Sequence, residues 1–100
     1  MTDSEWAANE LELYTINTGE LYAELMEACK HSLSCREAGR SYEAQHSMEG
    51  WLIGRAVPAY QREIDCDFRP DTVAIEQAAQ SILDSFYAEY DLGNYPDLKP

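Results

Sequence analysis

Two cysteines and two histidines are the residues of this chain with the clearest capacity for metal chemistry. Cys29, His31 and Cys35 lie close together, and His46 follows further on. Thiolate and imidazole groups are ligands that Zn²⁺ prefers, but the spacing differs from that of zinc fingers and ribbons. Cys29 and His31 would also project from different sides of a helix. We therefore expect Cys29 to be a small core residue, and we expect no metal ion or other cofactor.

The same region offers a thiol beside a base. Cys35 and His31 are one helical turn apart on a mostly exposed face, where an imidazole can activate a thiol. No glycine-rich loop accompanies them, and the glycines match neither GxGxxG nor GxxxxGK. For acid–base chemistry, Glu63 lies near Tyr60 and Arg62, but at a helix edge it should face solvent. We therefore expect a protein that is not an enzyme.

The charge is strongly acidic, with 19 Asp and Glu against 7 Lys and Arg and a net charge of −12. Residues 1–29 carry seven acids and no base, 30–69 carry six of each, and 70–100 carry six acids and one base. Direct binding to a phosphate backbone requires clustered Lys and Arg, and so does a helix lying on a membrane surface. Neither is expected here, and a charged partner should be basic.

The stretch 70–93 has the clearest helical pattern. Its glutamates, aspartates and glutamines recur on one side, and the apolar side chains gather on the other. Pro70 suits the first helical position and Gly93 suits the residue after the last turn. The predicted buried face consists of Ile75, Ala78, Ala79, Ile82, Leu83, Phe86 and Tyr90.

Two further helices are expected, over about 20–37 and 41–64. Asn17 and Glu20 form a capping-box pattern before the first, and a glycine at position 39 ends it. Ser41 should cap the second, and Pro58 removes a backbone hydrogen bond within it, so we expect a kink near 54–57. The apolar face of the first comprises Leu21, Tyr22, Leu25, Met26, Cys29 and Leu33.

The rest of the chain completes one small domain. Residues 1–17 form either a short helix capped by Asp3 or Ser4 or an extended arm, and 94–100 form a tail. The sequence thus predicts a single all-α domain over 1–100: a compact bundle of three main helices plus the N-terminal piece. It has neither a long apolar run nor the pattern of a secretory signal at its start, which predicts a cytoplasmic protein.

Acidic helix faces are the main functional signal. Carboxylates about 5–6 Å apart along a helix are comparable to the phosphate spacing of a nucleic-acid strand. Tyr87 has no core role on the helical wheel and is a candidate interface anchor. The alternative is that these faces only keep the domain soluble. The candidate partner-binding residues are Glu20, Glu24, Glu27, Glu76, Asp84, Tyr87 and Asp91.

Several short segments resemble a family of small helical proteins from bacteriophages and prophages. The segment LYTINTGELY at 13–22 is similar to its LYxxNTGELY opening. Further similar pieces, in order, are GRSY at 39–42, PAYQREI at 58–64, FRPDT at 68–72 and FYAEYDLGN at 86–94. The resemblance implies a mobile-element origin. It implies no catalytic residues, because the family has no assigned activity.

Together these features predict a small phage-type protein in the host cytoplasm that binds and inhibits or modulates a basic host protein. A defence complex (CRISPR or restriction) or a nucleic-acid-processing complex is the expected kind of partner. The alternative is a small-molecule-binding or sequestering oligomer, because Trp51, Ile53 and Val57 could form a pocket or a homodimer seam. The third hypothesis is an enzyme that uses Cys35 and His31.

Overall fold

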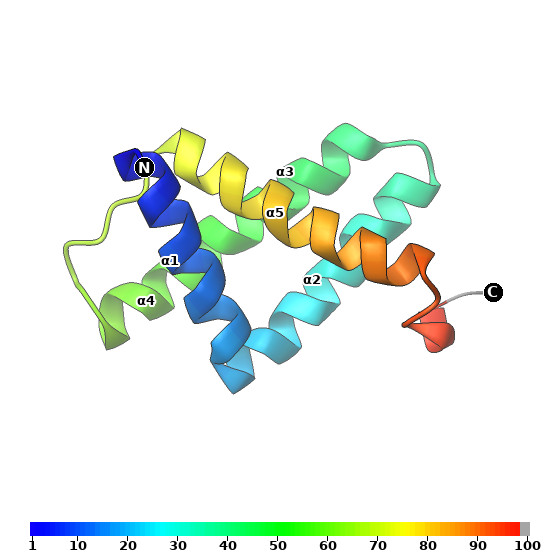
Figure 1. The fold of residues 1–100 in the computed structure, drawn as a ribbon, viewed down its shortest axis with the longest axis horizontal. Coiled ribbons are helices and arrows are strands. Elements are labelled where there is room, and N and C mark those ends of the chain that lie inside the picture. The colour runs from blue at the N-terminus through cyan, green and yellow to red at the C-terminus, as the bar shows by residue number, and fades with distance from the viewer. Residues whose placement is uncertain (99–100) are drawn as a thin grey trace.

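The computed structural model describes residues 1–98, and helices account for most of them (Figure 1). Those residues include no strand, so the all-α prediction is confirmed, and the N-terminal piece is a helix. No helix among them has the length and apolar character needed to cross a membrane. The elements are α1 (Asp3–Asn17), α2 (Gly19–Glu37), α3 (Ser41–Trp51), the π-helical turn η1 (Leu52–Ala56), α4 (Val57–Glu63), α5 (Thr72–Asp91) and the 3₁₀ turn η2 (Pro96–Leu98).

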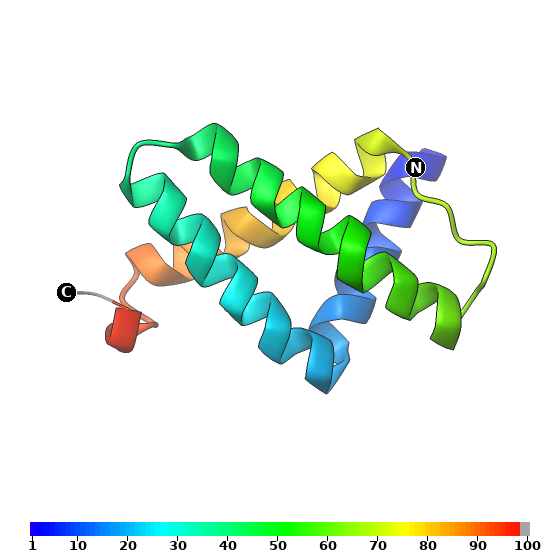
Figure 2. The ribbon, with the colours of Figure 1, turned by 180° about the vertical axis from the view of Figure 1, so that it is seen from behind.

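The helices form two layers. In Figure 1, α1 and α5 lie in front and α2 and α3 lie behind them. Figure 2 shows the rear layer from its own side, with α2 and α3 joined by a tight turn and α3 leading through η1 into α4. α2 packs mainly on α3, and α1 packs mainly on α5. α5 also contacts α3, so this helix packs against both α1 and α3.

The core lies between these layers. Leu11, Met48 and Leu52 are fully buried, and each comes from a different element. All seven residues predicted for the inner face of α5 are buried, so that prediction is confirmed. Tyr22, expected on the inner face of α2, is exposed instead, while Ser32 is buried and donates a hydrogen bond to the carbonyl oxygen of Ala44 at 3.0 Å. The α2–α3 contact therefore rests partly on a polar side chain.

The ends of α5 are fixed by local chemistry. Asp71, not Pro70, sets its beginning: the Asp71 carboxylate accepts a hydrogen bond from the Ala74 N–H at 2.8 Å. That bond, with a second from the Ser4 hydroxyl at 2.7 Å, holds the pKa of Asp71 below its usual value. The Ser4 bond also ties α1 to α5. At the other end Gly93 has a φ of 85° and the helix stops there, as predicted.

The starts of α1 and α2 also differ from the prediction. α1 is capped by Thr2, whose hydroxyl accepts from the Glu5 N–H, and not by Asp3 or Ser4. Asn17 is the last residue of α1, so it cannot cap α2, whose cap residue is Thr18. Because α1 extends to Asn17, the residue predicted to cap α2 is part of the preceding helix.

The cap of α3 also differs from the prediction. Ser41 is the first residue of α3, and the cap residue is Arg40. The Nε atom of Arg40 lies 3.0 Å from Glu43 Oε2, so an ion pair holds the first turn where a hydroxyl cap was expected. Gly39, with a φ of 79°, ends α2 as predicted.

A π-helical turn lies where the proline was expected to disturb the central helix. The N–H of Val57 bonds to the carbonyl of Leu52, five residues earlier, directly before Pro58. A wider turn is one way for a helix to accommodate a missing N–H donor. The ribbon continues through it from α3 into α4 (Figure 2), and the kink itself stays a prediction.

The segment after α5 folds back on the bundle. Tyr95 stacks on Phe86 with ring centroids 5.0 Å apart, and Leu98 packs against the core. Residues 99–100 of the predicted tail lie outside the described residues.

Leu11→Ala and Leu13→Ala form a matched pair on α1. Leu11 is fully buried, so its truncation should lower the free energy of unfolding by about 2–5 kcal/mol. Leu13 is exposed, so the same truncation should change it by less than about 0.5 kcal/mol. Urea unfolding followed by circular dichroism measures both, and equal effects would contradict this placement of α1.

Candidate functional site

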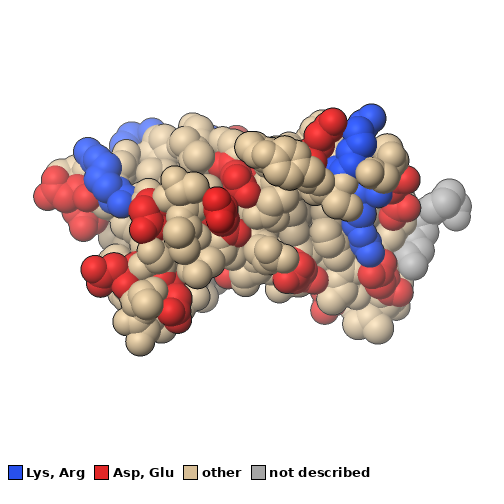
Figure 3. Space-filling model, turned by 90° about the horizontal axis from the view of Figure 1, so that it is seen from above, with Lys and Arg blue, Asp and Glu red and all other residues tan. Residues whose placement is uncertain are grey.

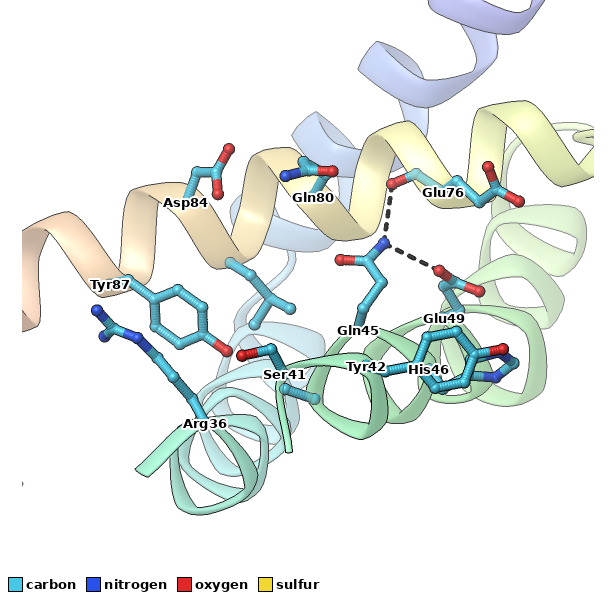
Figure 4. Close-up of a pocket in the computed structure, with 12 residues that line it drawn as sticks. Arg36, Ser41, Tyr42, Gln45, His46, Glu49, Glu76, Gln80, Asp84 and Tyr87 are labelled. Carbon is cyan, nitrogen blue, oxygen red and sulfur yellow. Dashed lines mark hydrogen bonds between the residues drawn. The ribbon is translucent and has the colours of Figure 1, made fainter. Parts of the chain in front are cut away.

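A groove of about 570 Å³ lies between α3 and α5, closed at one end by the C-terminal part of α2 (Figure 4). Most of its lining residues are polar or charged, so it offers hydrogen-bonding and ionic groups to a ligand. The lining side chains are Arg36, Ser41, Tyr42, Ala44, Gln45, His46, Glu49, Glu76, Gln80, Leu83, Asp84 and Tyr87.

The helical repeat places the polar side chains on the two walls. On α5, Glu76, Gln80 and Asp84 follow one another at intervals of four residues, so they line one side of that helix. On α3, Gln45 and Glu49 have the same interval and face them. The Gln45 amide donates to Glu49 Oε2 at 2.9 Å and to the Glu76 carbonyl oxygen at 3.2 Å, which links the two walls (Figure 4).

The groove carries an excess of negative charge. Glu49, Glu76 and Asp84 contribute three carboxylates, and none of them has an ion-pair partner within residues 1–98. The one guanidinium in the lining, that of Arg36, pairs with Asp91. In Figure 3, which views the molecule from above, carboxylates stand among neutral surface and the Lys and Arg side chains lie toward the two ends. The middle of this face is therefore the part without a counter-charge.

Tyr87 differs from the exposed anchor that the helical wheel predicted. It is half-buried and packs against the core, and the Arg36 guanidinium lies 4.4 Å from the centre of its ring. Arg36 Nη2 is 3.3 Å from Asp91 Oδ2, which holds the guanidinium over the ring. Burial raises the pKa of the Tyr87 hydroxyl. Arg36 thus covers part of the Tyr87 ring at this end of the groove, and both side chains are half-buried.

Two polar atoms in this covered end have no hydrogen-bond partner within residues 1–98. They are the Tyr87 hydroxyl oxygen and Arg36 Nη1, and both are buried. A buried donor without an acceptor costs about 1–3 kcal/mol. The contact with the Tyr87 ring and the ion pair with Asp91 therefore stabilise the position of Arg36, while its unpartnered Nη1 donor destabilises it.

The structure separates the seven candidate partner-binding residues. Glu76, Asp84 and Tyr87 lie together in the groove, and Asp91 lies next to it through its pair with Arg36. The other three are on the exposed side of α2 and do not line the groove; they are Glu20, Glu24 and Glu27.

Three of the candidate acids have an internal cation. Arg55 forms an ion pair with Glu24 through several contacts, and the shortest joins Nη2 to Oε2 at 2.7 Å. This hydrogen bonding lowers the pKa of the Glu24 carboxyl. Glu27 pairs with Lys30 at 3.0 Å, and Asp91 pairs with Arg36. The charge of these acids is partly balanced by the protein itself.

The sequence interpretation missed Gln45, Glu49 and Arg36 as groove residues. The four-residue interval of Gln45 and Glu49 was visible, but nothing in the sequence indicates that this edge of α3 faces α5. Arg36 ends α2, and only the α2–α3 turn brings it beside Tyr87.

The cysteines and histidines do not form one cluster. Cys29 is in the core, as predicted, and burial raises its pKa to about 12, so the unreactive thiol form is favoured. Cys35 is also buried, contrary to its predicted exposed face, although its Sγ lies 3.9 Å from His31 Nε2. In residues 1–98, potential metal ligands come together instead at Asp65, Cys66 and Asp67, all exposed and within 4.8 Å of one another.

The residues behind the oligomer alternative border a second hollow. Ile53 and Val57 line a mainly apolar depression of about 290 Å³ between α4 and the start of α5, with Ile75 behind them. Trp51 is half-buried and packs against the core. Only Ile53 among these is largely exposed.

Comparison with protein-family models, curated proteins and solved structures finds no match to this chain.

Tyr87→Phe tests the unpartnered hydroxyl. Removing it should leave the free energy of unfolding unchanged or raise it by up to about 1 kcal/mol, because no hydrogen bond is lost. Tyr60→Phe is the matched control, since the Tyr60 hydroxyl donates to Glu10 Oε2 at 3.2 Å and its loss should cost about 1 kcal/mol. Chemical denaturation measures both, and an equal loss in the two variants would show that Tyr87 has a partner.

Proposed function

We propose that this protein is a non-enzymatic binding protein that attaches to a basic surface of a host protein and inhibits or modulates it. The observation that carries the proposal is the groove between α3 and α5, with its carboxylates Glu49, Glu76 and Asp84 and no cation paired to them within residues 1–98. Carboxylates without an internal ion pair attract cationic groups of another molecule.

The spacing of the groove carboxylates suggests which cationic surface fits. Glu76 and Asp84 lie two helical turns apart on α5, about 12 Å along the axis, and Glu49 faces them from α3. The phosphates of one DNA strand advance about 3.4 Å per nucleotide, so Lys and Arg side chains that contact phosphates three to four nucleotides apart are spread over a comparable length. A protein that normally binds DNA or RNA is therefore the partner class we favour, with this chain occupying part of its phosphate-binding surface.

The resemblance of several segments to small phage and prophage proteins supports a setting in a bacterial cell. In that setting the partner would belong to a defence system, CRISPR or restriction, or to the nucleic-acid-processing machinery. The acids of α2 have a smaller part in this proposal than the sequence suggested, because Glu24 and Glu27 are paired internally. Glu20 keeps its place as a candidate, since it is exposed and has no ion pair in residues 1–98.

A second candidate is a small-molecule-binding or sequestering homodimer. It is favoured by the apolar depression beside Ile53 and Val57, which one copy leaves open. Light scattering over a dilution series separates the candidates, because this one requires association of the chain with itself.

Reversing the groove charges should remove partner capture. In a pull-down from host lysate with mass spectrometry, Glu76→Lys with Asp84→Lys should lose the proteins that the unmodified chain enriches, by about tenfold or more, since two attractive contacts become repulsive. Added duplex DNA should compete for the same proteins.

Glu63→Lys with Glu37→Lys is the matched control. Both residues are exposed and lie outside the groove, so this variant makes the same change in net charge and should retain capture. Equal capture by the two double variants, with unchanged circular dichroism spectra, would contradict the proposed role of the groove.

A further inference from the structure

Helix α1 has apolar residues on two opposite sides. Its inner face packs into the bundle with Ala7, Ala8, Leu11 and Thr15. On its outer face, however, Trp6, Leu13 and Ile16 are 50%, 57% and 41% exposed. Scattered apolar residues are normal on a protein surface, but three large ones on one short helix face form a stripe, which is typical of an interaction site.

The stripe has the spacing of a coiled-coil seam. Trp6, Asn9, Leu13 and Ile16 follow one another at intervals of three, four and three residues. These are the a and d positions of two heptads, the positions that insert between the side chains of a neighbouring helix. Asn9, at the first d position, is exposed and is the one polar residue among these four.

The edges of the stripe are acidic. In the same register, Glu5 and Glu12 occupy g positions and Glu10 occupies an e position, so carboxylates flank the stripe on both sides. Residues 1–29 contain no Lys or Arg, and none of these three glutamates has an ion pair within residues 1–98. Glu10 accepts a hydrogen bond from Tyr60, which leaves its negative charge in place.

Hollows of different character lie past the two ends of the stripe. Near its first turn, Trp6 borders a hollow of about 290 Å³ whose charged lining residues are Asp3, Asp65, Asp67 and Arg69. Near its last turn, Ile16 and the exposed Tyr22 line an apolar hollow of about 130 Å³. A helix lying along α1 would thus find further apolar contacts at one end and, at the other, three carboxylates beside one guanidinium.

We propose that the outer face of α1 is a docking surface for an amphipathic helix of a partner protein, with apolar a and d residues and Lys or Arg at the flanking positions. Interhelical charges at e and g positions select the partner in such pairs. A second copy of this chain fits poorly, because it would place Glu5, Glu10 and Glu12 against the same acids. The surface lies on α1, away from the α3–α5 groove, and does not depend on the function proposed for that groove.

The test uses two synthetic peptides of about three heptads each, both with Leu at a and d. One carries Lys at e and g and the other carries Glu. Calorimetric titration should give binding of the Lys peptide, accompanied by a gain of helical circular dichroism, and no binding of the Glu peptide. A Lys peptide of the same composition in scrambled order, which lacks the seam, should bind at least about tenfold more weakly.

Leu13→Glu and Leu92→Glu separate seam binding from general attraction to an acidic protein. Both add one negative charge at an exposed leucine, and Leu92 lies outside α1 with 76% exposure. Binding of the Lys peptide should weaken about tenfold or more in Leu13→Glu and stay within about twofold in Leu92→Glu. Glu5→Lys with Glu12→Lys should shift the preference toward the Glu peptide.

Equal affinities of the Leu13→Glu and Leu92→Glu variants would overturn the proposal, as would a Lys peptide that fails to bind at about 1 mM. So would a dimer of the unmodified chain, seen by light scattering, that Leu13→Glu dissociates, because the stripe would then be occupied by a second copy.

Discussion

The positions of the Lys and Arg side chains determine which carboxylates of this protein form ion pairs and which do not. Nineteen acids face seven Lys and Arg residues. Within residues 1–98, four of those cations pair with acids at 4.0 Å or less: Lys30, Arg36, Arg40 and Arg55. Exposed ion pairs stabilise a fold only slightly. Their larger effect here is on the charge of the surface. They neutralise some acidic side chains, and the unpaired acids keep a negative charge that can attract other molecules.

Two of these pairs join distant elements. Arg55 belongs to the π-helical turn and reaches Glu24 on α2, so a backbone irregularity beside Pro58 contributes to balancing the acids of α2. Arg36 covers the Tyr87 ring and pairs with Asp91, which balances the last turn of α5. Among the regions without such a pair within residues 1–98 are the middle of the α3–α5 groove and the two edges of the α1 stripe. Both proposed binding surfaces therefore follow from the same shortage of cations.

Local signals predicted the helices well. The periodicity of α5 specifies its buried face, and glycines with positive φ end both α2 and α5 as expected, because these features depend on neighbouring residues. Helix starts were predicted less well, although Asn17 and Ser41 are both common cap residues. Asn17 belongs to α1, which is longer than expected. Ser41 is already inside α3, whose cap residue Arg40 pairs with Glu43. A cap is only one of several ways to satisfy the first turn.

The site could be predicted only in part, because its contacts span long distances in sequence. Glu76 and Asp84 were identified from α5 alone, whereas Gln45 meets the Glu76 carbonyl across 31 residues and Arg36 meets Asp91 across 55. The burial of Cys35 likewise depends on the packing of α2 against the rest of the bundle. The α1 stripe has a visible three-four-three spacing, but it acquires meaning only once 1–17 is known to be a helix with another face in the core.

We expect the carboxylates of the α3–α5 groove to attract cations more strongly than the acids that pair with Lys or Arg within the protein. Nuclear magnetic resonance of the ¹⁵N-labelled protein, titrated with a short arginine peptide that cannot form an amphipathic helix, tests it most directly. We expect amide shifts at Gln45, Glu49, Glu76, Gln80 and Asp84 that are larger than those at the paired acids and that decrease as salt rises. Shifts of similar size at paired acids such as Glu24 and Glu27 would contradict it.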